Sequence, residues 1–153
     1  MPPWILPIIL LTCRLVAGGA LLLAGFLKTF QDPRTFALSV DSFGMVPQVV
    51  IPMIAHYLPV LEIAVGLVLV LGIWWREGAL LAAGLYTVFL AAVIWVVLSG
   101  KSLDCGCFSA LFGKGEIGIQ TIFRNVIFLA TASLVMIKGP GWLAMEQLLK
   151  PRS

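Results

Sequence analysis

Long apolar runs separated by short polar segments dominate the chain. Four of these runs are long enough to cross a bilayer as helices, namely residues 4–26, 49–72, 78–98 and 118–138. A hydrocarbon core about 30 Å thick requires roughly 20 apolar residues in a helix. The pattern therefore predicts an all-α fold, an integral membrane four-helix bundle in which residues 1–153 form a single four-span domain.

Two shorter segments predict helices that lie on the membrane surface. After the first run, Asp32 is a suitable N-cap, Pro33 fits the first helical position, and Gly44 can end the element. Apolar residues between them recur at helical spacing, at Phe36, Val40 and Phe43. Residues 142–149 predict a second interfacial helix beyond the fourth run.

Composition agrees with this class of protein. Hydrophobic residues make up 61% of the chain and charged residues 11%, far from ordinary soluble usage. The first run does not fit a cleavable signal peptide, because no Lys or Arg precedes Trp4, the run is too long, and Arg14 lies within it. We expect the lipid bilayer as its surroundings and no nucleic acid as a partner.

An even number of spans puts both termini on one side of the membrane. Lysine and arginine are balanced between the two sides, so the positive-inside rule does not decide the orientation. The larger number of acidic residues on the side of the loops 29–48 and 99–117 favours cytoplasmic termini. The second of these loops, which carries two cysteines, would then be extracytoplasmic, where a disulfide persists more readily.

Three charged residues lie well inside the predicted spans, away from their ends: Arg14, Glu62 and Arg124. Each disfavours insertion by about 2.5–3.5 kcal/mol when it lies near a helix centre, so we expect all three to face the bundle interior. Measured from the loop-side ends of their runs, Arg14 and Glu62 lie at similar depths near the midplane. The sequence therefore predicts an ion pair between these two residues.

Helical spacing predicts a polar seam inside the bundle. In the first run, one stripe contains Arg14, Gly18, Leu21, Gly25 and Lys28. Stripes in the second and fourth runs contain Pro59, Glu62 and Gly66, and Gln120, Arg124 and Thr131. The glycines would allow a neighbouring backbone to approach closely. Two interpretations stay open: the charges fix helix register, or they handle protons or a ligand.

Two other features are expected to be structural. The third run contains no charged residue and fits a scaffold helix. Cys13 lies roughly 20 Å of helix away from the loop-side surface, too far to join a disulfide at Cys105, and we expect it to pack in the core.

The tripeptide Cys105-Gly106-Cys107 carries the clearest chemistry. Only a tight turn brings two cysteines at this spacing within disulfide distance, and Gly106 permits that turn. The ring would be strained and easily reduced, and it closes too short a loop to add much stability, so exchange explains it better than stapling. Asp104 opposes thiolate formation, whereas Lys101 favours it. Unreactive thiols or metal capture remain alternatives, although two sulfurs fall short of four ligands and we assign no metal site.

Several of these residues together resemble the DoxX-like superfamily and, within it, the cysteine-bearing methylamine-utilisation protein MauE family. The residues that carry the resemblance are Arg14, Gly25, Lys28, Pro59, Glu62, the box Asp104-Cys105-Gly106-Cys107-Phe108, and Arg124-Asn125. The resemblance covers roughly Leu11 to Ile137 and departs from the family at Ser109, where glycine is common. It implies a four-span bundle in a bacterial inner membrane that takes part in thiol–disulfide exchange beside extracytoplasmic thioredoxin-like proteins.

Residues and resemblance together predict a membrane thiol–disulfide oxidoreductase or electron relay. Cys105 and Cys107 would be the redox pair, and the supporting polar network would consist of Arg14, Lys28, Glu62, Arg124 and Asp104. The sequence specifies no bound cofactor, but the resemblance suggests a quinone. The alternatives are a quinone-linked oxidoreductase subunit of DoxX type, a carrier for a thiophilic metal ion, and an accessory subunit that docks a partner.

Overall fold

Helices account for nearly all of residues 4–100 and 119–141, the part of the chain that this computed structural model describes. They are α1 (Ile5–Phe30), α2 (Pro33–Phe43), α3 (Ile51–Leu71), α4 (Trp75–Leu98) and α6 (Ile119–Lys138). Within these residues no strand occurs, and α1, α3, α4 and α6 are long and apolar enough to cross a membrane. The predicted all-α fold with four spans is confirmed.

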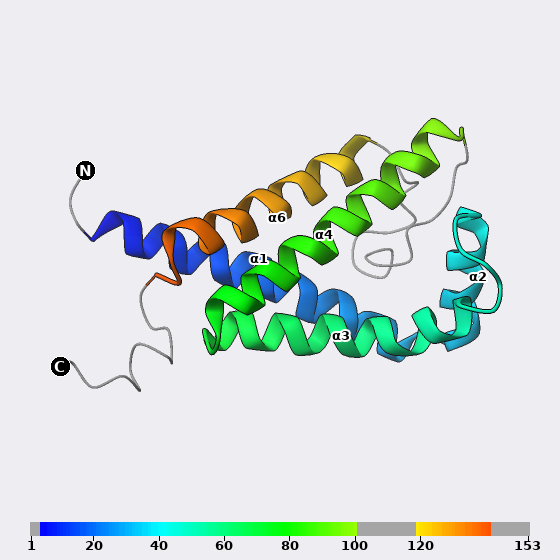
Figure 1. Ribbon diagram of the computed structural model, residues 1–153, viewed down its shortest axis with the longest axis horizontal. Helices are drawn as coiled ribbons and strands as arrows, with labels where there is room; N and C mark the ends of the chain where they lie inside the picture. The colour runs from blue at the N-terminus through cyan, green and yellow to red at the C-terminus, as the bar shows by residue number, and fades with distance from the viewer. Residues whose placement is uncertain (1–3, 101–118, 142–153) are drawn as a thin grey trace.

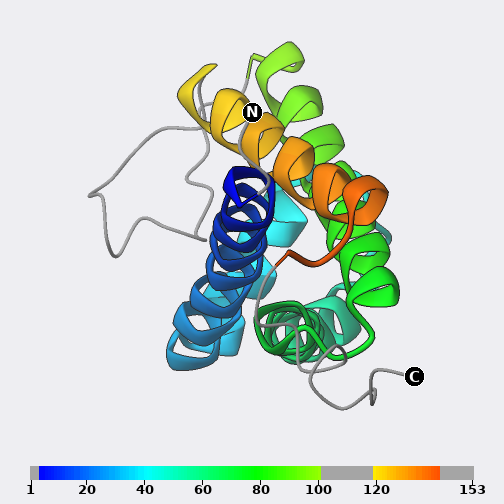
Figure 2. The same cartoon turned by 90° about the vertical axis from the view of Figure 1, so that its left-hand side faces the viewer.

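The four long helices form an antiparallel bundle. Helix α1 packs mainly on α3, and α4 packs mainly on α6, while α1 also contacts α6 and α3 also contacts α4. Figure 1 shows that α1 and α4 end, and α3 and α6 begin, at the same end of the bundle as α2. We call this the α2 end. Figure 2 looks at the bundle from the opposite end, where α1 begins and α6 finishes.

The short helix α2 follows the capping signals in the sequence. The side chain of Asp32 accepts a hydrogen bond from the Arg34 N–H at 2.9 Å, and Gly44 ends the helix in the left-handed conformation with φ 66°. Its buried residues Phe36 and Val40 form a cluster with two residues of α3, Ile51 and Ala55. The predicted short helix is confirmed, and its apolar face packs on the α2 end of the bundle.

A tight turn joins α3 to α4. Gly72 ends α3 with φ 68°, and Trp74 precedes α4 with φ 45°, so two left-handed residues reverse the chain within a few positions. A non-glycine residue at positive φ is uncommon. The turn forces α3 and α4 to be antiparallel neighbours.

Glycines on α1 and α3 allow these two helices to approach closely. A Cβ atom built on Gly18 would lie 3.0 Å from the Gly66 carbonyl oxygen, and one built on Gly25 would lie 2.7 Å from the Pro59 carbonyl oxygen. Neither distance leaves room for a methyl group. These contacts set the register of α1 against α3, as the glycine stripe predicted.

Alanine at Gly25 is expected to destabilise the protein by about 1–3 kcal/mol, because its methyl group would overlap the backbone of α3. The matched control is Gly19→Ala on the same helix, where an added Cβ meets nothing within 4 Å. Alanine is the better helix former, so the control should be neutral or stabilised by up to about 1 kcal/mol. Unfolding in mixed detergent micelles measures both. Equal effects at the two positions would contradict this account of the helix contact.

Candidate functional site

The predicted polar stripe of α1 faces the bundle interior along its whole length. All five of its members are buried: Arg14, Gly18, Leu21, Gly25 and Lys28. The facing stripe of α3 is buried as well, at Pro59, Glu62 and Gly66. The prediction for these two helices is confirmed.

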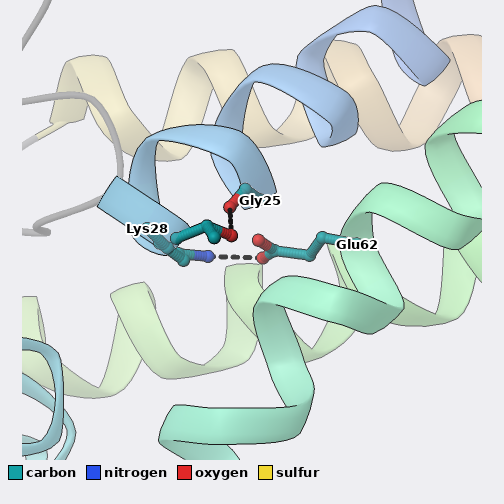
Figure 3. Close-up of polar contacts among 4 residues, drawn as sticks. Gly25, Lys28 and Glu62 are labelled. Atoms are coloured by element: carbon teal, nitrogen blue, oxygen red, sulfur yellow. Dashed lines mark hydrogen bonds and ion pairs between the residues drawn. The ribbon is translucent and has the colours of Figure 1, made fainter. Parts of the chain in front are cut away.

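A buried salt bridge joins α1 to α3 near the α2 end. Lys28 Nζ pairs with Glu62 Oε1, and Figure 3 shows the two side chains pointing at each other from neighbouring helices. Lys28 is 3% exposed and Glu62 is fully buried. The ammonium also lies 5.3 Å from the ring centre of Phe36 and 4.9 Å from that of Phe89, both within the range of cation–π attraction. Lys28 therefore sits among three helices besides its own.

The ion pair predicted between Arg14 and Glu62 is wrong. Glu62 pairs with Lys28, and Arg14 donates a hydrogen bond through Nη1 to the carbonyl oxygen of Pro140, at 3.1 Å. The glycine contacts explain the difference, because they put Glu62 at the level of Gly25, some 16 Å of helix away from Arg14. The predicted depths assumed that α1 stops at residue 26, whereas it continues to residue 30.

A pocket of about 190 Å³ lies between the helices beside Lys28. Its walls are almost entirely apolar, and four residues with polar groups line it: Lys28, Tyr86, Arg124 and Asn125. Aromatic rings come from Phe36, Phe43, Phe89 and Phe128. Helices α1, α2, α3, α4 and α6 all contribute to the lining, so the pocket exists only in the assembled bundle.

Two polar residues at this pocket had no assigned role in the sequence interpretation. Tyr86, on the helix predicted to be only a scaffold, donates its hydroxyl to the Ala17 carbonyl oxygen at 2.6 Å. Asn125 is 8% exposed, and its Nδ2 donates to the Thr121 carbonyl oxygen at 2.9 Å. The sequence does contain a signal for Tyr86, because a tyrosine in the middle of a span indicates a hydrogen-bond partner inside the bundle for its hydroxyl.

The inward face of α6 differs from the predicted one. Gln120 is exposed, and Arg124 and Thr131 are half-buried. The buried residues of this helix are Asn125, Ala132 and Val135. The prediction is therefore wrong for Gln120, because α6 turns its small and branched residues toward the core that it shares with α4 and α1.

Comparisons with known proteins agree with this architecture. The profile of the family described as methylamine utilisation protein MauE matches residues 6–138. The methylamine utilization protein MauE of Paracoccus denitrificans is 32% identical over 136 residues, which cover 88% of this chain and 72% of that protein. This chain belongs to the MauE family. No solved structure matches it.

Family membership and the four apolar spans identify this MauE-family chain as an integral membrane protein. The aligned region includes both the pocket and the cysteine tripeptide. Asp104, Cys105 and Cys107 lie outside the described residues, as does the helix expected at 142–149. Cys13 is half-buried against the core, as predicted for a packing role.

Proposed function

We propose that this MauE-family protein is a membrane thiol–disulfide oxidoreductase or electron relay. Cys105 and Cys107 would cycle between dithiol and disulfide, and the partner would be an extracytoplasmic protein with a thioredoxin fold. The Paracoccus relative is named for methylamine utilization, and we place the activity of this chain in the same process.

One observation carries the proposal. Three of the four polar groups that line the pocket, those of Lys28, Arg124 and Asn125, lie toward the α2 end, where α1 and α4 stop and α6 starts. Residues 101–118, which contain both cysteines, connect these two helices. Arg124 lies little more than one turn inside α6, and Val93 lies a similar distance inside α4. This arrangement supports a redox pair attached at the mouth of a bundle whose interior holds Lys28 and Glu62.

The exchange reaction needs only the two sulfurs and a partner disulfide. A thiolate of the pair attacks one partner sulfur, the other partner sulfur leaves as a thiolate, and a mixed disulfide forms. The second cysteine then attacks its neighbour and releases the partner as a dithiol. The pair is left oxidised, and two electrons with two protons have passed to the partner. The same steps in reverse oxidise the partner.

A quinone-linked oxidoreductase is the second candidate, and the pocket favours it. A relay that turns over repeatedly needs an electron acceptor or donor besides the thioredoxin-fold partner. An apolar pocket with Lys28, Arg124 and Asn125 at its lining offers a place for one inside the membrane. We propose the same orientation for both candidates, with cytoplasmic termini and an extracytoplasmic cysteine segment in the bacterial inner membrane.

Thiol labelling in intact cells tests the proposal. A membrane-impermeant maleimide should label Cys105 and Cys107 only after reduction, because the resting pair is expected to hold a disulfide on the outer side. The variant Cys13→Ala lacks the third cysteine of the chain, so any label on it is attached to Cys105 or Cys107. Labelling without prior reduction, together with no loss of labelling after treatment with an oxidant, would overturn the redox assignment. Labelling only after the membrane is made permeable would overturn the orientation.

A further inference from the structure

The pocket beside Lys28 is open toward the lipid. Val88 lines it from the middle of α4 and is 64% exposed, and Met45 lines it from the segment after α2 and is 46% exposed. An exposed residue in the middle of a membrane span faces acyl chains. The opening between α2 and α4 is therefore an apolar entrance from the side, and a molecule that uses it would come from within the bilayer.

The inner part of the pocket carries polar groups, in contrast to the apolar entrance. Lys28 is only 3% exposed, and its ammonium lies between the Glu62 carboxylate and two aromatic rings. The side-chain amide of Asn125 and the guanidinium of Arg124 line the same space. Lysine and arginine only donate hydrogen bonds, and the asparagine amide also carries donors. The head group that fits this end is one that accepts hydrogen bonds.

Size and wall shape narrow the ligand further. An engineered apolar cavity of about 150 Å³ is large enough to hold benzene. A volume of about 190 Å³ therefore accommodates one substituted six-membered ring. Phe89 and Phe128 supply flat apolar surfaces for such a ring, and the tail would leave through the entrance at Val88.

We propose that this pocket binds the carbonyl-bearing ring of a membrane quinone, which enters sideways between α2 and α4. Lys28 donates a hydrogen bond to one carbonyl oxygen, and Glu62 holds the ammonium in place as a positioning residue. Electron transfer between this quinone and the cysteine pair rests on the proposed function, whereas binding of the quinone does not. Oxidation of one dithiol to a disulfide releases two electrons and two protons, and reduction of the two quinone carbonyls to hydroxyls consumes the same number of each.

Photolabelling with an azido derivative of a short-chain ubiquinone tests the site in nanodiscs. We expect labelled peptides from α1 and α4 around Lys28 and Phe89. Ala92 lines the pocket, whereas its neighbour Ala91 is exposed and does not. Ala92→Phe should therefore reduce labelling about tenfold, and the matched control Ala91→Phe should leave it unchanged. Equal labelling of the two variants, or labelling confined to peptides outside the pocket, would overturn the site.

Two further measurements separate the head group from the tail and binding from redox chemistry. Unlabelled quinone should compete with the label, whereas oleate, which has an apolar tail but no ring, should not; equal competition would make this a general acyl-chain site and overturn the quinone assignment. The variant Lys28→Gln/Glu62→Gln removes both charges together and should weaken labelling about tenfold. Unchanged labelling there would overturn the role of Lys28. The variant Cys105→Ser/Cys107→Ser should lose thiol–disulfide exchange but bind the label normally. Unchanged exchange with retained binding would refute the thiol relay and leave the quinone site standing, whereas loss of binding in this variant would overturn the site.

Discussion

Replacement of both Cys105 and Cys107 with serine is expected to reduce thiol–disulfide exchange to the uncatalysed background. A hydroxyl cannot form a disulfide, so neither the attack on a partner nor the resolution of a mixed disulfide can take place. The measurement follows the redox state of an added thioredoxin-fold protein by alkylation and gel shift, with purified protein in nanodiscs. Exchange at the native rate in the double variant would refute the proposed function.

Cys13→Ala provides the control for this experiment. Cys13 packs against the core in the middle of α1, so its replacement should leave exchange unchanged. The single variants Cys105→Ser and Cys107→Ser add a positive test. The variant that retains the attacking cysteine should accumulate a mixed disulfide with the partner, because the second thiol that releases it is missing. This result would also identify which cysteine attacks.

Substitution of Lys28 by methionine is expected to lower the free energy of unfolding by about 3–5 kcal/mol, because it leaves the Glu62 carboxylate buried without its lysine. The variant Lys28→Met/Glu62→Leu removes both charges and should recover most of the loss, since well-packed apolar side chains often replace a buried ion pair at little cost. Unfolding in mixed detergent micelles compares the native protein, the single variants Lys28→Met and Glu62→Leu, and the double variant, which together form a double-mutant cycle.

An exposed charge on α2 supplies the matched control. Arg34→Met removes a cation close in sequence to Lys28 but at an exposed position, so it should change stability by no more than about 0.5 kcal/mol. If Lys28→Met were as mild as Arg34→Met, or if the double variant were as unstable as the single one, the salt bridge would not hold α1 and α3 together in the way described.

Most of the architecture could be predicted from the sequence because the signals are local. A run of about 20 apolar residues has few alternatives to a membrane helix. Likewise, Asp32, Pro33 and Gly44 specify the start and end of α2 through their own side chains and backbone preferences. The face of α1 that packs inside the bundle could also be predicted, since the spacing of Gly18 and Gly25 identifies one side of the helix.

The partner of Glu62 could not be predicted in the same way. Pairing across helices depends on how far one helix slides along the other, and Glu62 lies level with Gly25, about one turn from Lys28 and about three turns from Arg14 along α1. The contact of Gly25 with Pro59 sets that position, and only the three-dimensional structure shows that these two residues meet. The pocket could not be predicted from the sequence for a similar reason, because its lining residues come from five helices and no single stretch of sequence contains them.

The hydrogen bond from Arg14 to Pro140 has a consequence for the order in which the protein is made. These residues are 126 positions apart, and Arg14 belongs to the first span while Pro140 follows the last. The ribosome therefore delivers the guanidinium to the insertion machinery long before this carbonyl exists. The native surroundings of α1 are therefore complete only after α6 has been inserted, and the hydrogen bond from Arg14 to Pro140 is one of the last contacts that can form during synthesis of the bundle.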